Sequence, residues 1–185
     1  MVPGLFVALV SSFALGCGGS TSPVAPQGQS GGLIQNGSFE HNGEPTLAGW
    51  AFGNSELASS ARLAPSGEGA WSLRLDADWA PTLGFAYAKV TDVRPGDRLR
   101  LSAFVRAVQP NGDGGGIIAI VFGDSPMSPD QVCGAGTSES TWTPVSVEAL
   151  VPEGKTVWVL LSSLHTEVTQ RSGLFDGVQL VRLEP

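Results

Sequence analysis

The amino-acid sequence predicts an all-β fold, a sandwich of two packed antiparallel sheets with about ten strands. Apolar residues alternate with a period of two along several segments, and no long stretch has the spacing of an amphipathic helix. Glycine and proline are abundant, with 25 and 13 copies in 185 residues, as expected where tight turns join many short strands. Hydrophobic residues form 42% of the chain, which is enough to bury the core of one domain.

The longest expected strand lies between Asp97 and Val108, where apolar and mostly polar residues alternate. One face carries Leu99, Leu101, Ala103, Val105 and Ala107, and the other carries Arg98, Arg100, Ser102, Phe104 and Arg106. A second strand is expected over residues 85–93. The segment Arg94-Pro95-Gly96-Asp97 has the residues of a tight turn and is expected to join the two strands as a hairpin.

Further strands are expected wherever Gly, Pro, Asn and Asp separate short apolar segments. They cover residues 33–39, 50–52, 57–63, 72–77, 117–122, 142–149, 156–163 and 174–183. Several tryptophans stand at the start of these segments or within them among apolar neighbours, which predicts that they belong to the core. They are Trp50, Trp71, Trp142 and Trp158.

The N-terminal part of the chain is expected to be an export signal followed by a tether. Residues 1–16 are almost wholly apolar and small, and they are fewer than the about 20 residues that a helix needs to span a bilayer. Residues 17–32 are uncharged and rich in Gly, Ser and Pro, which is typical of a flexible linker. The folded domain is therefore expected to cover residues 33–185.

Small residues surround the first cysteine, in the order Leu15-Gly16-Cys17-Gly18-Gly19-Ser20. This segment resembles a bacterial lipoprotein signal, which implies cleavage before Cys17, a lipid on its thiol and a place in the cell envelope or on the outer surface. No Lys or Arg precedes the apolar segment, and Ala14 and Leu15 depart from the usual residues of such signals. An ordinary secretory signal and a disordered apolar tail are the alternatives.

The second cysteine, Cys133, lies in a Gly-rich stretch of the domain. A lipid on Cys17 would exclude a disulfide, so Cys133 is expected to act as a small buried hydrophobic residue. The alternative is a bridge between Cys17 and Cys133 in case the lipoprotein interpretation is wrong.

The charge balance argues against nucleic acid as a partner. The chain has 10 basic and 17 acidic residues, a net charge of -7, and no cluster of Lys and Arg stands out locally. Such a surface repels a phosphate backbone.

Several short motifs follow one another in order from residue 36 onward. They are Asn36-Gly37-Ser38-Phe39-Glu40, Gly49-Trp50, Gly69-Ala70-Trp71-Ser72-Leu73-Arg74-Leu75, Arg94-Pro95-Gly96 with Leu101-Ser102-Ala103, Trp142-Thr143 and Phe175-Asp176-Gly177-Val178. Together they resemble the carbohydrate-binding module family 4/9 of the galactose-binding-like jelly-roll group. The resemblance covers nearly the whole chain from Leu33 onward, and it implies a jelly-roll sandwich with a glycan as its ligand.

In that family a structural calcium ion often joins the first strand to the last. The resemblance places this ion between the carboxylates of Glu40 and Asp176, with backbone carbonyls around Ser38 and Gly69 as further ligands. Calcium favours about six to eight hard oxygen ligands, and two carboxylates supply the charge that carbonyls lack. The alternative is that both acids only accept backbone hydrogen bonds at strand ends. Gly177 stands where family members often have a second acid.

Sugar recognition in that family combines aromatic faces with polar side chains. With Ala86, Ala88 and Val90 pointing inward, Phe85, Tyr87 and Lys89 point outward, and Phe104 and Arg106 are expected beside them on the adjoining strand. The predicted ligand-binding residues are Trp79, Phe85, Tyr87, Phe104 and Arg106, with Trp79 overhanging the surface and Arg106 as hydrogen-bond donor. The alternative is that Phe85 and Phe104 pack beneath a loop.

No constellation of residues specifies a reaction, so a non-catalytic protein is expected. The segment Gly123-Asp124-Ser125 is similar to the nucleophile block of certain serine esterases, but no Asp precedes His165 at the spacing that would activate the serine. Glu56, Asp76 and Glu148 stay open as acids for glycoside cleavage. The expected function is a surface-tethered domain that binds a poly- or oligosaccharide. The alternative is a structural or protein-interaction sandwich of the cell envelope without a sugar site.

Overall fold

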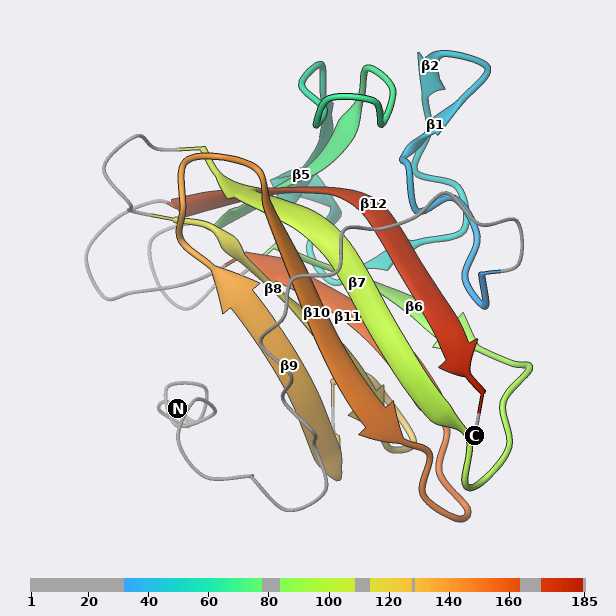
Figure 1. The fold of residues 1–185 in the computed structure, drawn as a ribbon. Helices are drawn as coiled ribbons and strands as arrows, with labels where there is room; N and C mark the ends of the chain where they lie inside the picture. The colour runs from blue at the N-terminus through green and yellow to red at the C-terminus, as the bar shows by residue number, and fades with distance from the viewer. Residues whose placement is uncertain (1–31, 78–83, 109–113, 128, 164–170, 185) are drawn as a thin grey trace, which may run out of the picture.

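The computed structural model describes residues 32–77, 84–108, 114–127, 129–163 and 171–184. It confirms the predicted all-β sandwich, because two five-stranded antiparallel sheets pack face to face (Figure 1). Two short strands, β1 (Glu40–His41) and β2 (Glu44–Pro45), form a separate ribbon. Within the described ranges, the helical structure is limited to the 3-10 turn η1 (Ser55–Leu57).

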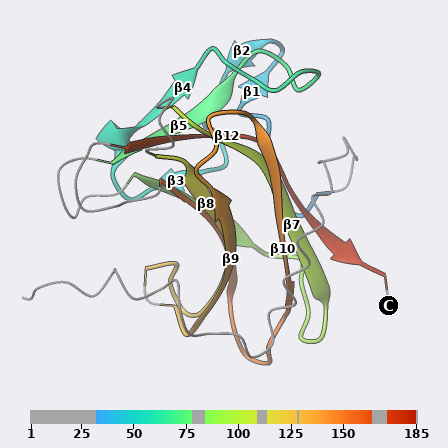
Figure 2. The same cartoon turned by 60° about the vertical axis from the view of Figure 1, so that its left-hand side comes forward.

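One sheet, called here the β7 sheet, has the strand order β10-β7-β12-β5-β4. Its strands are β4 (Ala58–Ala61), β5 (Ser72–Ala77), β7 (Arg98–Ala107), β10 (Thr143–Leu150) and β12 (Arg171–Leu183). The other, the β6 sheet, has the order β3-β6-β11-β8-β9. Its strands are β3 (Ala51–Phe52), β6 (Phe85–Val90), β8 (Gly116–Phe122), β9 (Gln131–Thr137) and β11 (Val157–Ser163). Figure 2 shows β7 and β10 in one layer and β8 and β9 in the other.

Fully buried aromatic and aliphatic side chains fill the space between the two sheets. Phe39, Phe122 and Phe175 are the largest of them, and each is 0% exposed. Burying a side chain of this kind contributes about 1.5–3 kcal/mol to folding. Gly116 makes room for Phe175, because a Cβ there would lie 2.1 Å from the Phe175 Cζ atom. The core therefore depends on a small residue in β8 as well as on apolar ones.

The first segment of the domain lies beside the last strand, as the family resemblance implied. The N–H of Leu33 donates to the carbonyl of Leu180 at 2.8 Å, and the N–H of Val178 donates to the carbonyl of Gly37 at 2.9 Å. The close approach requires glycine, because a Cβ at Gly37 would lie 1.8 Å from the Val178 carbonyl oxygen. The strand expected over residues 33–39 is instead a series of bends and turns, and the first strand starts at Glu40.

The last strand, β12, contains a bulge that reverses the alternation of its side chains. The register with β7 shifts between Asp176 and Gln179, and Gly177 has a φ of 57°. Asp176 pairs with Phe104 and Gln179 pairs with Ser102, so both share the outer face with these β7 residues. The outward positions of β12 are therefore even-numbered before the bulge and odd-numbered after it.

The predicted hairpin between β6 and β7 is wrong, because the two strands belong to different sheets. β6 pairs with β3 and β11, whereas β7 pairs with β10 and β12. The turn itself does form, and the N–H of Asp97 donates to the carbonyl of Arg94 at 3.0 Å. Proline and glycine indicate that a chain reverses direction, but they do not indicate which sheet receives the next strand.

The predicted burial of four tryptophans is confirmed for one of them. Trp50 is 8% exposed and packs against Phe39, with ring centroids 5.5 Å apart. Trp71, Trp142 and Trp158 are partly exposed and are not part of the core, so the prediction is wrong for them. A tryptophan that begins a strand next to apolar residues can face either side of the sheet.

Some predictions concern residues outside the described ranges. These are the signal over residues 1–16, the tether up to residue 31, the lipid on Cys17 and the position of Trp79. In the part of the chain that the structure describes, no helix has the length and apolar character needed to cross a membrane.

Candidate glycan and calcium sites

The predicted sugar-binding residues are divided between the two outer faces of the sandwich. Phe85 and Tyr87 alternate with buried residues along β6 and face outward from the β6 sheet. Phe104 and Arg106 alternate with buried residues along β7 and face outward from the β7 sheet. The prediction that they form one surface is therefore wrong, because it depended on the hairpin between β6 and β7.

An aromatic row, defined here as Phe85, Tyr87 and Trp158, crosses the outer face of the β6 sheet. The rings of Phe85 and Tyr87 are stacked with centroids 6.2 Å apart, and the rings of Tyr87 and Trp158 meet edge to face at 6.1 Å. The Nζ atom of Lys89 lies 5.7 Å from the centroid of the Trp158 ring, within the range of a cation–π contact. All three rings are partly exposed, so they present a connected aromatic surface to solvent.

Contacts within the protein hold the ends of the aromatic row in place. The Nε1–H of Trp158 donates to the carbonyl of Gly123 at 3.1 Å, which orients the indole. The ring of Phe85 covers Gly53, where a Cβ would lie 1.6 Å from the Phe85 Cζ atom. Trp158 is therefore fixed by a hydrogen bond, and Phe85 is fixed by its packing on a glycine.

Trp158 was missed as a site residue, although the sequence contained a signal for it. Along β11, Val157, Val159 and Leu161 are buried, and the residues between them are partly exposed. This period of two places Trp158 on the outer face together with Lys89, its partner in the register of β11 and β6. The register itself cannot be read from one sequence.

Glu40 follows a residue in an unusual backbone conformation. Phe39 has a φ of 54°, in the left-handed region where a bulky residue is rare, and its side chain is fully buried. The Oε2 atom of Glu40 accepts hydrogen bonds from the N–H groups of Ala70 at 2.9 Å and Trp71 at 3.1 Å. Gly69 lies against the same carboxylate, because a Cβ there would be 2.2 Å from Glu40 Oε1. The N-terminal acid is thus attached to the segment that leads into β5.

Asp176 lies at the bulge of β12 and is 0% exposed. Its Oδ1 atom accepts a hydrogen bond from the N–H of Gly177 at 2.7 Å, whereas Oδ2 is buried and has no hydrogen-bond partner among the described residues. Burial raises the pKa of Asp176 to about 8; the Gly177 N–H opposes this shift, and the negative charges of Glu68 and Glu40 add to it. A buried carboxylate oxygen without a partner, close to two other acids, is suited to a cation.

Ser72 adds a second buried oxygen at the same place. Its hydroxyl is fully buried and has no hydrogen-bond partner in the described part of the chain. The register of β12 and β5 ends at Phe175 and Leu73, so Asp176 and Ser72 occupy the next positions on the outer face. No three His, Cys, Asp or Glu side chains of the described residues form a ready metal cluster. A cation would therefore need hydroxyl and carbonyl oxygens besides the carboxylates, a donor set that fits calcium.

Two of the three acids considered for glycoside cleavage, Glu148 and Asp76, form ion pairs, and the third, Glu56, is exposed. Glu148 forms ion pairs of 2.6 Å with Arg98 and with Arg100. Burial opposes the ionisation of Glu148, but the hydrogen bonds and charges of the two arginines outweigh it and lower its pKa. Asp76 forms an ion pair of 2.8 Å with Arg74. A general acid for glycoside cleavage needs a raised pKa, which is the opposite of what Glu148 has.

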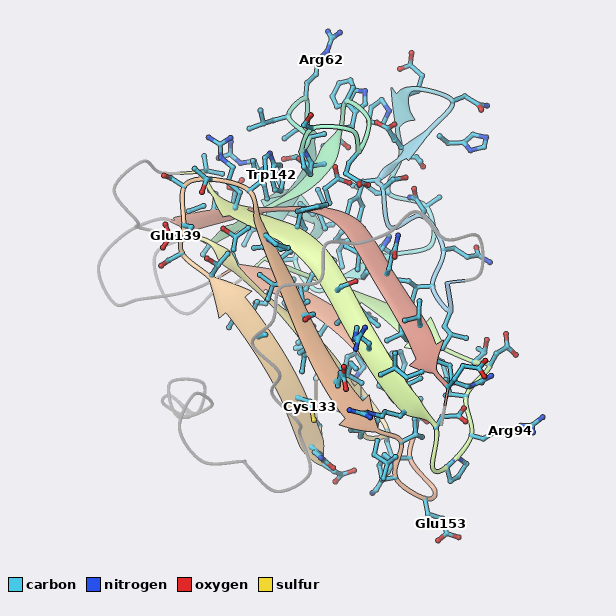
Figure 3. All side chains as sticks on the ribbon, viewed as in Figure 1. Arg62, Arg94, Cys133, Glu139, Trp142 and Glu153 are labelled. Carbon is cyan, nitrogen blue, oxygen red and sulfur yellow. The ribbon has the colours of Figure 1, made fainter. Side chains whose placement is uncertain are left out.

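Ser125 and Cys133 also form contacts within the protein. The hydroxyl of Ser125 accepts a hydrogen bond from the N–H of Met127 at 3.1 Å, as in a turn. Cys133 lies in β9 (Figure 3) and is 1% exposed, which confirms the predicted burial. It is disulfide-bonded, however. The expectation that Cys133 acts only as a small hydrophobic residue is therefore wrong.

Comparison with known proteins finds similarity at the level of the fold. No family model and no curated protein matches the sequence. The enzymatically active domain of bacteriophage CBA120 tailspike protein 4 has a TM-score of 0.60 and 14% identity, over 82% of this chain and 21% of that chain. A module named TmCBM61, solved with β-1,4-galactotriose, has a TM-score of 0.57 and 15% identity, over 82% of this chain and 99% of that chain.

A third similar structure is the xylan-binding CBM22-1 domain from Paenibacillus barcinonensis, with a TM-score of 0.56 and 14% identity, over 77% of this chain and 90% of that chain. With identities of 14% to 15%, these structures show the fold alone. The chain spans about a fifth of the length of the tailspike chain, so the similarity says nothing about the activity of the tailspike as a whole. The chain thus has the jelly-roll β-sandwich fold found in several carbohydrate-binding modules.

Proposed function

We propose that this protein is a non-catalytic glycan-binding module whose ligand lies on the aromatic row of the β6 sheet. The observation behind the proposal is the connected set of three partly exposed rings on one sheet face. Exposed aromatic surface of this kind is typical of a binding site. The fold found in carbohydrate-binding modules supports the proposal.

The chemistry of a sugar fits this surface. The C–H groups on the face of a pyranose ring pack on aromatic rings, and its hydroxyl groups need polar partners at the rim. Lys89 stands at the Trp158 end of the row, and Ser162 pairs with Phe85 at the other end. Because the Trp158 N–H is already bonded to Gly123, this indole offers its face to a ligand rather than its hydrogen-bond donor.

Fixed rings also reduce the cost of binding. A side chain that is already held in one conformation loses less rotational freedom when the ligand arrives. Trp79, as a further residue over this surface, stays a prediction. Phe104 and Arg106 lie on the opposite sheet and do not belong to this site.

A structural calcium ion at Glu40 and Asp176 is the second part of the proposal. Asp176 Oδ2 and the Glu40 carboxylate would hold the ion, together with the Ser72 hydroxyl and carbonyl groups near Ser38 and Gly69. The buried oxygens without partners support this assignment. A divalent cation would offset the repulsion among the neighbouring acids and would link the N-terminal segment to β12.

The third part of the proposal concerns location. We expect export through residues 1–16 and attachment to the cell envelope through the tether of residues 17–32. The chain has two cysteines, so a lipid on Cys17 requires that the disulfide at Cys133 is not formed in the exported protein. The intact mass of the protein from the membrane fraction decides between them, because acyl chains add several hundred daltons and a disulfide removes two hydrogens.

Binding to neutral insoluble polysaccharides and to a glycan array tests the main proposal. Tyr87→Ala and Trp158→Ala should each weaken binding at least about 10-fold, while the melting temperature stays within a few degrees of wild type. Leu150→Ala, which removes an exposed apolar side chain from the opposite sheet, is the control and should bind neutral glycans like the wild type. If no glycan is retained by the wild type, the structural or protein-interaction module replaces the proposed function.

A further inference from the structure

Arg106 differs from the other arginines whose side chains the structure describes. Four of these side chains form ion pairs with acids, namely Arg74, Arg98, Arg100 and Arg182. Arg62 and Arg94 are exposed to water. Arg106 is half-buried on the outer face of the β7 sheet and forms no ion pair with any described acid, and its buried Nε–H has no acceptor. A partly buried charge without a partner is costly unless something else supplies the acceptor.

Trp142 brings a second donor without an acceptor to the same place. It directly precedes β10, where Thr143 pairs with Val105, so the register extended by one residue places Trp142 across from Arg106. Its side chain is half-buried, and its Nε1–H is buried without a hydrogen-bond partner in the described part of the chain. The N–H of Ala107 donates to the carbonyl of Glu139 at 2.7 Å, which holds the loop before Trp142 against the end of β7. The register thus brings two N–H donors without acceptors to the same end of β7 and β10.

The surroundings of these donors are apolar. Phe104 precedes Arg106 on the same face of β7 and pairs with Pro144 of β10, and both are partly exposed. On the other side Arg106 pairs with Leu174, which is 3% exposed. Among the acids nearby, Asp76 is bound to Arg74 and Ser172, Asp176 is buried at the proposed calcium site, and Glu139 is exposed and forms no ion pair with Arg106. The donors therefore lie beside two aromatic rings and a proline, and none of these acids accepts a hydrogen bond from them.

We propose that Phe104, Arg106 and Trp142 form a second binding site, which takes a carboxylate-bearing sugar such as a uronic acid residue of an acidic glycan. A carboxylate accepts two parallel hydrogen bonds from a guanidinium, and the Trp142 N–H adds a third donor. The rings of Phe104 and Trp142 give the pyranose ring an apolar surface to pack on. A sugar carboxylate thus satisfies both the donors and the aromatic surface, which a bare inorganic anion does not.

This site is separate from the aromatic row because it lies on the opposite sheet. A neutral glycan has no carboxylate that could bind Arg106. Near the aromatic row, the described cation is Lys89, and its ammonium group already lies over the Trp158 ring. The two sites are therefore expected to differ in ligand charge and in their response to salt, since an exposed charge pair weakens as ionic strength rises. The proposal of a second site therefore does not depend on whether the aromatic row binds a glycan.

Isothermal titration with trigalacturonic acid tests the inference, with its methyl-esterified form as the uncharged ligand of the same linkage. The wild type should bind the acid at least 10-fold more tightly than the ester at low salt. Arg106→Gln should reduce binding of the acid at least 10-fold, and Arg106→Lys should keep part of it, because a lysine retains the charge without the paired donors. Arg94→Gln is the matched control, with the same change of charge at the opposite end of the molecule from Trp142 (Figure 3).

Several results would overturn the inference. The first is that the wild type does not bind trigalacturonic acid. The second is that the wild type binds the methyl ester as tightly as the acid. The third is that Arg106→Gln and Arg94→Gln lose the same amount of affinity for the acid. If Arg106→Gln lowers the melting temperature, Trp142→Phe serves as a second variant, because it keeps the ring and removes the N–H; it should reduce binding of the acid a few-fold. Loss of acid binding in Tyr87→Ala would show that the ligand sits on the β6 sheet instead. An acidic peptide that competes as well as trigalacturonic acid would overturn the assignment to a sugar.

Discussion

The two outer faces of the sandwich are built from different kinds of side chain. The face of the β6 sheet is crossed by the aromatic row, whose rings contact one another and a single lysine. The face of the β7 sheet carries ion pairs instead, because Glu148 binds Arg98 and Arg100, and Asp76 binds Arg74, while Arg106 is left unpaired among the described residues. Paired charges stabilise the fold that contains them, whereas exposed rings remain available to a ligand.

This difference predicts that substitutions on the two faces change different properties. Changes among the paired charges and at the proposed calcium site of the β7 sheet should alter the stability of the protein. Changes on the β6 face should alter binding and leave stability nearly unchanged. The following experiments test this division.

Removal of calcium should have the largest effect, and it should act on stability alone. A ligand present at 100 to 1,000 times its Kd stabilises the folded state by about 3–4 kcal/mol, so EDTA should lower the melting temperature by several degrees. Asp176→Asn should make the melting temperature insensitive to EDTA. Scanning calorimetry with and without the chelator measures both, and an unchanged wild-type curve would remove calcium from the site.

A pair of glycines provides the matched control for this experiment. Gly67 and Gly69 both have φ values in the left-handed region, 90° and 102°, so alanine is strained at either position. A Cβ at Gly69 would meet the Glu40 carboxylate, whereas a Cβ at Gly67 has no heavy atom within 4 Å. Gly69→Ala should therefore reduce the response to EDTA, and Gly67→Ala should keep it.

The stability of the metal-free protein should depend on pH through Asp176. Its pKa is raised to about 8 in the folded state, whereas an unfolded Asp ionises near pH 4. Between these values the folded chain holds a proton that the unfolded chain has lost, so stability should fall as the pH rises, by at most about 1.4 kcal/mol per pH unit. Urea unfolding in EDTA between pH 5 and 8 measures the slope, and Asp176→Asn should flatten it. A wild-type slope of the opposite sign would contradict the burial of an unpaired Asp176.

Glu148→Gln should destabilise the protein by about 1 kcal/mol. The Glu148 side chain is 10% exposed, but its partners Arg98 and Arg100 are 64% and 32% exposed, so solvent screens part of the interaction. Because the pKa of Glu148 is lowered, its contribution is complete at neutral pH and is lost as the pH falls below about 4. Wild type and variant should therefore become equally stable in acid, while neutral glycan binding is the same in both. A difference that persists in acid would contradict the ion-pair account.

Gly53→Ala should have the smallest effect, and it should act on binding. The added Cβ would overlap the ring of Phe85, which must then move from its place at the end of the aromatic row. We expect a loss of a few-fold in affinity for the neutral glycan and a change in stability of about 1 kcal/mol or less. Gly134→Ala, where the nearest atom to a new Cβ would be 3.4 Å away, is the control on the same sheet. Equal affinities of the two variants would show that the position of Phe85 does not matter.

The all-β sandwich could be predicted from the sequence because each strand carries its own alternation. Alternation in β7 separates Leu99 and Leu101 from Arg98 and Arg100, and the structure confirms this division of faces. The pairing of strands could not be predicted in the same way. The Pro95-Gly96 turn has the same local chemistry whether the next strand stays in one sheet or crosses to the other.

The candidate sites show the same limit. Phe85 and Tyr87 could be predicted to share a face, because they are two residues apart on one strand. Trp158 joins them through the register of β11 and β6, which involves residues about 70 positions away in the chain. The closeness of Glu40, Glu68 and Asp176, and the buried oxygen of Ser72, likewise depend on contacts between distant segments.

The bulge in β12 has a consequence for how this chain can vary. Gly177 is one extra residue in β12, and it determines which of the residues after it point inward and which point outward. Deleting it would turn Leu180, now 0% exposed, toward water and direct Gln179 and Val181 into the interior. A point substitution in the C-terminal half of β12 therefore changes one side chain, whereas a change in the length of the strand would turn every side chain after the bulge to the opposite face.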